Sequence, residues 1–195
     1  MFGEKSYLCP RFALVHNKKR KAMKKMKVIA MLTAFALTAS LATAQELPRK
    51  VSNIEILDLN GKPAKLPHFG EKNLMIFYVD PDRHKQNNDF TLELERTHRA
   101  ESENIYGFGI MNLKDAPMVP NGMARNMAKK RTEKNGALVL ADQERVLSTT
   151  WGLGDCNNQF VLLFVTKEGE LVFLRKGELS EQDKQAFYDV IDRYK

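Results

Sequence analysis

Three apolar segments constrain the fold of this 195-residue chain most strongly. They are Asn73–Asp80, Ile105–Leu113 and Ala137–Ala141, and none of them alternates apolar with polar residues. Runs of strand length without alternation are typical of strands covered on both faces. Parallel strands of this kind need long crossover connections, which are usually helices. The three segments therefore predict an α/β protein.

The connecting segments have helical features. Asn88–Ser102 is modestly amphipathic, and the strongly basic segment Gly122–Asn135 ends at Gly136, a typical helix stop. A final helix is predicted to start at Ser180, because Ser180 and Asp183 have the spacing of a capping box.

Two hairpins complete the pattern. Val51–Leu66 surrounds Asn60-Gly61, the strongest short hairpin signal, and Phe160–Thr166 and Leu171–Lys176 flank a polar turn. The order of elements predicts a thioredoxin-like fold, a mixed central sheet with helices on both faces and an N-terminal β-hairpin extension. Topology alone carries no function.

Residues 1–44 are predicted to be a leader with a signal peptide. Residues 28–41 are apolar and uncharged, follow the basic run Lys18–Lys27, and precede Ala42-Thr43-Ala44, a small-x-small cleavage signal. The apolar stretch is shorter than the ~20 residues of a membrane span, so no stable anchor is expected after cleavage. Cleavage after Ala44 would leave residues 45–195 as a single periplasmic domain. Met23 or Met26 would each open a leader of ordinary length, so we expect either that translation starts later than Met1 or that the basic region is extended.

The formal net charge of +7 belongs to the leader. Residues 1–44 hold nine Lys and Arg against one acid, whereas residues 45–195 hold 22 bases and 23 acids, a net charge of −1. A nucleic-acid partner is therefore not expected, since such a partner requires a concentrated basic face.

One basic helix remains in residues 45–195. A solvated face is the ordinary interpretation of such a run, and contact with anionic lipid or polysaccharide at the envelope is the functional alternative. The basic residues are Arg125, Lys129, Lys130, Arg131 and Lys134.

The two cysteines, Cys9 and Cys156, cannot form a Cys-x-x-Cys pair. Cys9 falls in the predicted leader, which leaves Cys156 as the one cysteine of an exported domain. Redox-active thioredoxin folds place their cysteines after the first central strand, where a helix N-terminus lowers the thiol pKa. The corresponding segment here, Asp80–His84, contains no sulfur. The sequence thus predicts that the usual redox centre is missing.

The Asp80–His84 segment has two other interpretations. Asp80, Asp82 and His84 could ligate a metal, or the segment could be an Asp-Pro turn whose acids suit the following helix start. Two carboxylates and one imidazole fall short of a full ligand set. We therefore expect no metal site and no cofactor.

The loop Asp155–Phe160 is expected to lie beside the Asp80–His84 turn. If His84 approached Cys156, a thiolate–imidazolium pair could act as a nucleophile. An inert thiol or an intermolecular disulfide are the alternatives for Cys156. Phe160 stands where redox-active relatives have a cis-proline, and its peptide bond is expected to be trans. The side chains predicted to bind ligand are those of Asp80, Asp82, Asn157 and Asn158.

Several stretches carry a resemblance to a known family. They are the residues 56–63 (ILDLNGKP), 74–79 (LMIFYV), 110–112 (IMN), 120–123 (PNGM), 138–142 (LVLAD), 151–153 (WGL) and 165–179 (VTKEGELVFLRKGEL). Together they resemble the YtfJ-like family of exported bacterial thioredoxin-fold proteins of unsettled function. The resemblance implies a fold and a compartment, and it supplies no catalytic residues.

The sequence favours a non-catalytic binding or accessory protein of the cell envelope. It would act on an envelope protein or small ligand through the segments Asp80–His84 and Asp155–Phe160. The alternative is an enzyme, a one-cysteine thiol or peroxide reductase that uses Cys156 with His84. A metal carrier that uses Asp80, Asp82 and His84 is a third interpretation.

Overall fold

A computed structural model of the chain describes residues 46–116 and 120–195. The predicted leader, its cleavage site after Ala44 and Cys9 lie outside these residues. None of the helices in the described ranges is long and apolar enough to cross a membrane.

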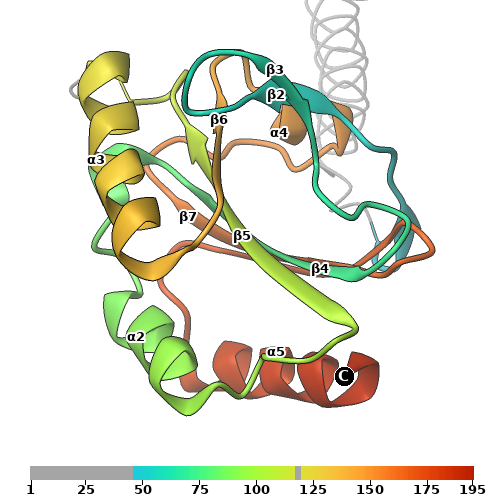
Figure 1. The fold of residues 1–195 in the computed structure, drawn as a ribbon. Coiled ribbons are helices and arrows are strands. Elements are labelled where there is room, and N and C mark those ends of the chain that lie inside the picture. The colour runs from blue at the N-terminus through green and yellow to red at the C-terminus, as the bar shows by residue number, and fades with distance from the viewer. Residues whose placement is uncertain (1–45, 117–119) are drawn as a thin grey trace, which may run out of the picture. The chain divides into compact units, whose positions relative to one another are not determined.

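The strands form one mixed sheet of eight, in the order β1-β8-β7-β4-β5-β6-β2-β3 (Figure 1). The strands β4, β5 and β6 run parallel, whereas β7 and β8 are antiparallel and extend the sheet beyond β4. The seven strands that the sequence predicted, three central strands and two hairpins, are all present. Their bounds are β1 Arg49–Lys50, β2 Glu55–Leu57, β3 Pro63–Lys65, β4 Asn73–Val79, β5 Ile105–Asn112, β6 Val139–Asp142, β7 Phe160–Val165 and β8 Glu170–Lys176.

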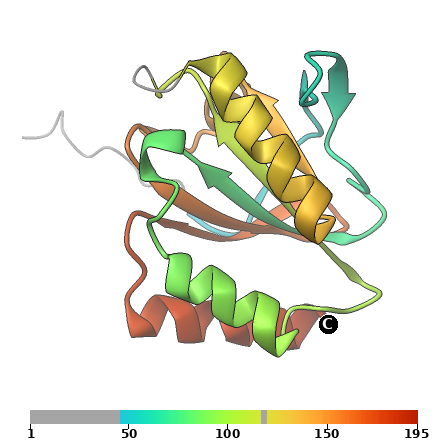
Figure 2. The same cartoon turned by 60° about the vertical axis from the view of Figure 1, so that its left-hand side comes forward.

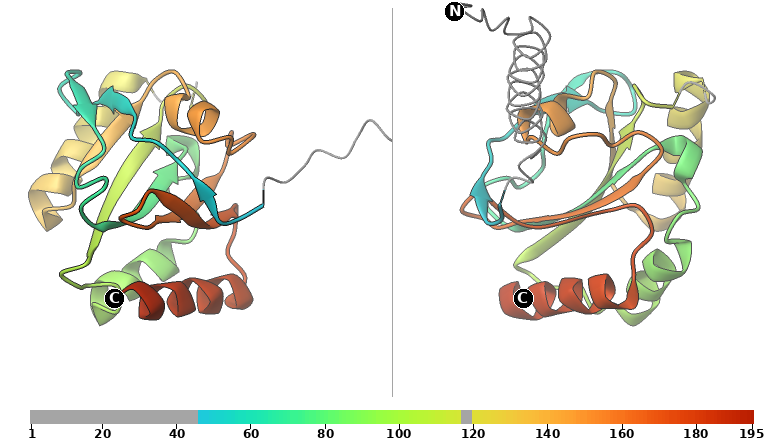
Figure 3. Two further views of the ribbon diagram at one scale, coloured as in Figure 1. Left: turned by 90° about the vertical axis from the view of Figure 1, so that its right-hand side faces the viewer. Right: turned by 180° about the vertical axis from the view of Figure 1, so that it is seen from behind.

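Helices cover both faces of the sheet, as predicted. Helices α2 (Asn88–Thr97), α3 (Asn121–Asn135) and α5 (Glu181–Tyr194) lie on one face (Figure 2). The short helix α4 (Val146–Thr150) lies on the opposite face from α5, as the views from the side and from behind show (Figure 3). A 3-10 turn, η1 (Pro81–Arg83), precedes α2.

Two of the three predicted helix ends agree with the structure, and the third does not. The capping box at Ser180 is confirmed, since its hydroxyl accepts the Asp183 N–H at 3.1 Å and its own N–H donates to the Asp183 carboxylate at 3.0 Å. Gly136 ends α3 with φ +71°, also as predicted. The prediction for α2 was too long, because His98 adopts φ 52° and ends the helix after Thr97.

The N-terminal hairpin of β2 and β3 is present, but its turn is wider than Asn60-Gly61 alone suggests. The Asp58 carboxylate accepts the N–H groups of Asn60 and Lys62, each at 2.8 Å, and organises the turn. Gly61 has φ +81°. The hairpin joins the sheet through one pair, Leu57 beside Ala141 of β6.

The outer strands of the sheet are short. At one edge β1 contributes two residues beside β8, and at the other β3 contributes three, the first of which is Pro63.

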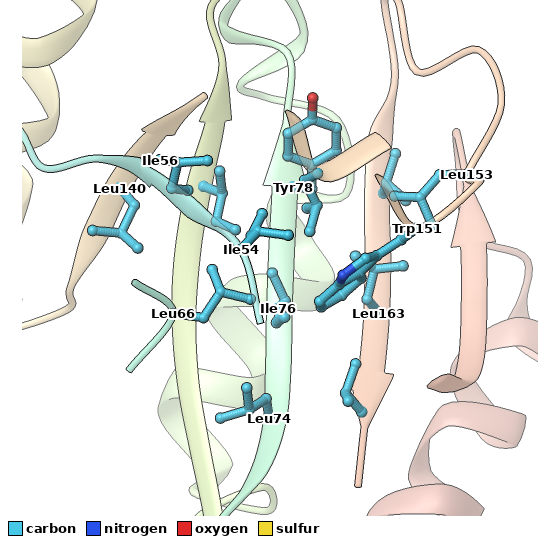
Figure 4. Packing of buried hydrophobic residues seen from close by; sticks show 14 of the residues in the cluster. Ile54, Ile56, Leu66, Leu74, Ile76, Tyr78, Leu140, Trp151, Leu153 and Leu163 are labelled. Carbon is cyan, nitrogen blue, oxygen red and sulfur yellow. The ribbon is translucent and has the colours of Figure 1, made fainter. Parts of the chain in front are cut away.

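The central strand β4 is packed on both faces, which explains its unbroken apolar sequence. Leu74, Ile76 and Tyr78 are fully buried in a cluster with Trp151 (Figure 4). The residues between them on β4 point to the other face, where α2 and α5 supply buried aromatic side chains, among them Phe90 and Phe187.

Candidate functional site

Each of the three parallel strands leads into a buried Asp or Asn. Asp80 follows β4, Asn112 is the last residue of β5, and Asp142 is the last residue of β6. All three side chains are completely shielded from solvent. The carboxyl ends of parallel strands meet at one edge of a sheet, where α/β proteins place ligands. Asn112 and Asp142 were not predicted from the sequence, although a polar residue ends each apolar run.

Asp80 connects the turn after β4 to the loop before β7. Its carboxylate accepts the N–H of Asp82 at 2.9 Å and the N–H of Asn158 at 2.8 Å. Its own N–H donates to the Gln159 carbonyl at 3.1 Å. Burial raises the pKa of Asp80, although these backbone hydrogen bonds act in the opposite direction. The two segments therefore lie side by side, as expected from the sequence.

The loop itself has the backbone that the sequence suggested. The peptide bond before Phe160 is trans, because the single cis bond of the described residues precedes Pro48. Asn158 adopts φ 53°, and the Phe160 N–H donates to the Gln86 side chain at 2.8 Å. The loop is thus held by hydrogen bonds to both the turn and the start of α2.

Asp142 organises the start of α4. One carboxylate oxygen accepts the N–H groups of Glu144 and Val146 at 3.2 and 2.9 Å. The other accepts the Leu147 N–H at 2.9 Å and the Tyr78 hydroxyl at 3.3 Å. Burial and the nearby Asp142 charge raise the pKa of Tyr78 far above its usual range, so its hydroxyl stays a donor.

A third acid, Asp115, forms an ion pair with Arg145. The Arg145 Nε lies 2.7 Å from Asp115 Oδ1, and the Asn112 amide donates to Oδ2 at 2.6 Å. Burial alone would raise the pKa of Asp115, but the bonds from Arg145 and Asn112 outweigh it and the pKa is lowered. Asp115 is therefore a carboxylate at neutral pH.

Cys156 is buried beside these acids. Its side chain is 3% exposed, and its Sγ contacts the Gly154 carbonyl oxygen at 3.5 Å. Burial raises the pKa of the Cys156 thiol to about 11. It lines a polar cavity of about 440 Å³ together with Asp115, Arg145, Ser148, Thr149, Gly152, Gly154, Asp155 and Asn157.

His84 lies in a different setting. Its ring is exposed, and its Nδ1 lies 2.9 Å from the Pro81 carbonyl oxygen. It lines a second, larger cavity, to which Pro81 and Phe160 also contribute. His84 contacts Pro81 and Cys156 contacts Gly154, so neither of these hydrogen bonds links His84 to Cys156.

The remaining predicted residues lie at the surface of the two joined segments. Asp82 is half-buried, and Asn157 and Asn158 are exposed. The Asn158 amide donates to the Asn157 side-chain oxygen at 3.1 Å. Among the residues that the structure describes, no three His, Cys, Asp or Glu side chains are placed to share a metal ion.

Comparisons with known proteins concern the fold. No family model matches the chain, and no curated protein matches it. The exposed lipoprotein thioredoxin of Streptococcus pneumoniae strain TIGR4 is 18% identical, with 73% of this chain and 99% of that chain covered and a TM-score of 0.51. A DsbF homologue from Corynebacterium diphtheriae is 14% identical, with 76% and 88% covered and a TM-score of 0.56. A putative thioredoxin from Neisseria meningitidis is 14% identical, with 73% and 89% covered and a TM-score of 0.53. The fold of this chain is therefore thioredoxin-like.

Proposed function

We propose that this chain is an exported accessory protein of the cell envelope, similar to the YtfJ-like proteins, that binds an envelope protein or a small ligand without turning it over. The signal-like leader supports the periplasmic location, and the thioredoxin-like fold supports the family. The binding surface is the ridge formed by Asp80–His84 and Asp155–Phe160.

The state of Cys156 carries the proposal. A thiol acts as a nucleophile only as the thiolate, and redox-active cysteines are accessible and have a lowered pKa. Cys156 has the opposite properties, since it is 3% exposed and its pKa is raised to about 11. His84, the base that would activate it, lines the other cavity. These features favour a structural thiol.

The ridge has the properties of a preorganised binding surface. Three hydrogen bonds fix the backbone of both segments. The Asn158 N–H donates to the Asp80 carboxylate, the Asp80 N–H donates to the Gln159 carbonyl, and the Phe160 N–H donates to the Gln86 side chain. A fixed surface loses little conformational entropy when it binds a partner. The exposed side chains of His84, Asn157 and Asn158 supply donors and acceptors on it.

Alkylation of the native protein tests the role of Cys156. A pKa of about 11 against the ordinary ~8.5 lowers the thiolate fraction about 300-fold at neutral pH, so iodoacetamide should react far more slowly with native than with urea-unfolded protein. The rate of alkylation against pH, followed by mass spectrometry, should rise with a midpoint near 11.

Turnover assays separate the two functions. The wild type should reduce neither insulin disulfides nor hydrogen peroxide with dithiothreitol, thioredoxin or glutathione as reductant, and Cys156→Ser should behave identically. A native alkylation midpoint below neutral pH, together with turnover that Cys156→Ser abolishes, would establish the one-cysteine reductase instead.

A further inference from the structure

An apolar cleft of about 650 Å³ lies between α2 and α3, over the face of the sheet that these helices cover. Its floor consists of side chains of β4 and of the adjacent face of β5. Its walls include Leu94 of α2 and Met127 of α3. Volumes of this size are typical of small-molecule sites. The floor residues are Met75, Phe77, Val79, Gly107, Gly109 and Met111.

Two glycines give the cleft its depth. Gly107 and Gly109 lie beside Met75 and Phe77 in the register of β4 and β5. A Cβ on Gly107 would lie 2.7 Å from the terminal methyl of Met75, whereas a Cβ on Gly109 would meet only Val139 Cγ2 at 3.6 Å and two backbone oxygens at 3.9 Å. Glycine weakens a strand interior and often marks a site where a ligand approaches the backbone.

The cleft is long and narrow. It follows β5 from Ile105 to Met111, which at ~3.3 Å per residue is about 20 Å. The backbone groups of β5 are already paired with β4 on one side and β6 on the other. An extended peptide on this floor would therefore leave its own N–H and C=O groups without partners, whereas a hydrocarbon chain would not.

The walls differ in charge. Helix α3 carries five basic residues and one acid, Glu133. The acids that line the cleft are Glu95 of α2 and Glu101, and the Glu101 carboxylate lies 2.5 Å from His98 Nδ1. No lysine or arginine is among the described residues that line the cleft, so the excess of positive charge on α3 can favour an anionic head group only at the rim.

The basic residues of α3 do not all border the cleft. Lys130 is three residues after Met127, so both lie on the same side of the helix. Arg125 lies on another side, since its guanidinium is 3.3 Å from the position that a Cβ on Gly61 of the hairpin turn would take. Lys129, four residues after Arg125, shares that side. Lys130 is therefore the described lysine best placed at the cleft.

Met127, one of the exposed large apolar side chains, lines the cleft. The exposed large apolar side chains of the described residues are Leu92 on α2 and Met123 and Met127 on α3, each at least half exposed. Methionine adapts to ligands of irregular shape.

We propose that the cleft binds one long-chain carboxylate, an anion of the fatty-acid class. Its hydrocarbon chain would lie along Gly107 and Gly109, and its carboxylate would lie near Lys130. The cleft shares Pro81, His84 and Phe160 with the ridge. The proposal rests on the apolar part of the cleft, and it holds whether or not Cys156 reacts.

Titration calorimetry with dodecanoate, kept below its micelle concentration, tests the proposal on the purified protein. We expect saturable binding of one dodecanoate. Gly109→Val should weaken binding about tenfold, because the added methyl groups occupy the volume that two methylene groups of dodecanoate would fill. The melting temperature of this variant should be unchanged or higher, since valine suits a strand better than glycine. Gly122→Ala is the matched control, because nothing lies within 4 Å of its added Cβ and it is outside the cleft.

Two lysine variants test the position of the head group. Lys130→Gln should weaken dodecanoate binding about threefold and leave the binding of uncharged dodecanol unchanged. Lys129→Gln should change neither affinity.

Four outcomes would overturn the proposal. One is the absence of saturable dodecanoate binding, and another is wild-type affinity in a folded Gly109→Val variant. The third is binding of phosphatidylglycerol vesicles but not of monomeric dodecanoate, which would indicate contact between α3 and a membrane surface. Sedimentation provides a further check, because dimerisation that Gly109→Val abolishes would identify a second copy of the chain as the occupant.

Discussion

Replacement of Asp142 by alanine should lower the free energy of unfolding by about 3 kcal/mol. Its carboxylate is the acceptor for three backbone N–H groups at the start of α4 and for the Tyr78 hydroxyl. Alanine removes all four bonds and leaves the Leu147 N–H and the Tyr78 hydroxyl buried without their acceptor. A buried donor without a partner costs about 1–3 kcal/mol, so the combined loss is large. Urea unfolding followed by Trp151 fluorescence measures it.

Two variants serve as controls for Asp142→Ala. Asp155 is exposed and accepts one N–H, that of Asn157, so Asp155→Ala should cost about 0.5 kcal/mol. Tyr78→Phe removes one donor and should cost about 1 kcal/mol. If Asp142→Ala were no more destabilising than Asp155→Ala, α4 would not depend on the Asp142 carboxylate.

Replacement of Asp80 by alanine should lower the free energy of unfolding by about 2 kcal/mol and make the two segments of the ridge more mobile. The variant loses the two bonds that the carboxylate accepts from Asp82 and Asn158, and with them the side-chain link between the turn and the loop. The Asn158 amide proton should then exchange with solvent faster than in the wild type. Amides in the middle of α5, such as that of Phe187, should keep their rates relative to global unfolding and are the internal control.

The contribution of Asp80 to the free energy of unfolding should decrease as the pH rises. Burial raises the pKa of Asp80 above the unfolded value of about 3.9, so the native state binds more protons than the unfolded state between the two values. The stability contributed by Asp80 is therefore full below pH 3.9 and decreases as the pH rises through the folded pKa. In urea unfolding, the difference in free energy of unfolding between the wild type and Asp80→Asn should be smaller at pH 7 than at pH 4. An advantage that grows over this range would mean that the native pKa is lowered.

The central strands and the last helix could be predicted because their signals are local. The unbroken run at Asn73–Val79 reflects packing on both faces, and the capping box at Ser180 lies within four residues. The end of α2 was missed because the left-handed conformation of His98 has no sequence signal as strong as a glycine. The two-residue strand β1 is too short to show any periodicity.

The candidate site was predicted only in part. Asp80 and Asn158 were chosen from the sequence and are hydrogen-bonded to each other. Asn112, Asp115 and Asp142 were missed, because a polar residue that holds the backbone at the end of a strand has no sequence signal that distinguishes it from an ordinary turn residue. The cleft was missed as well, since Gly107 and Gly109 lie within an apolar run and look like ordinary strand residues.

The short outer strands of the sheet have a consequence for the behaviour of the folded protein at high concentration. A neighbouring chain can extend a sheet only where a row of unpaired N–H and C=O groups is long enough to template it. The two residues of β1 and the three of β3 offer almost no such row, and Pro63 lacks an N–H altogether. Strand addition is therefore disfavoured along β1 and β3. Residues 172–176 of β8 extend past β1 without an outer strand partner among the described strands, so they are the part of the edge where another chain could add.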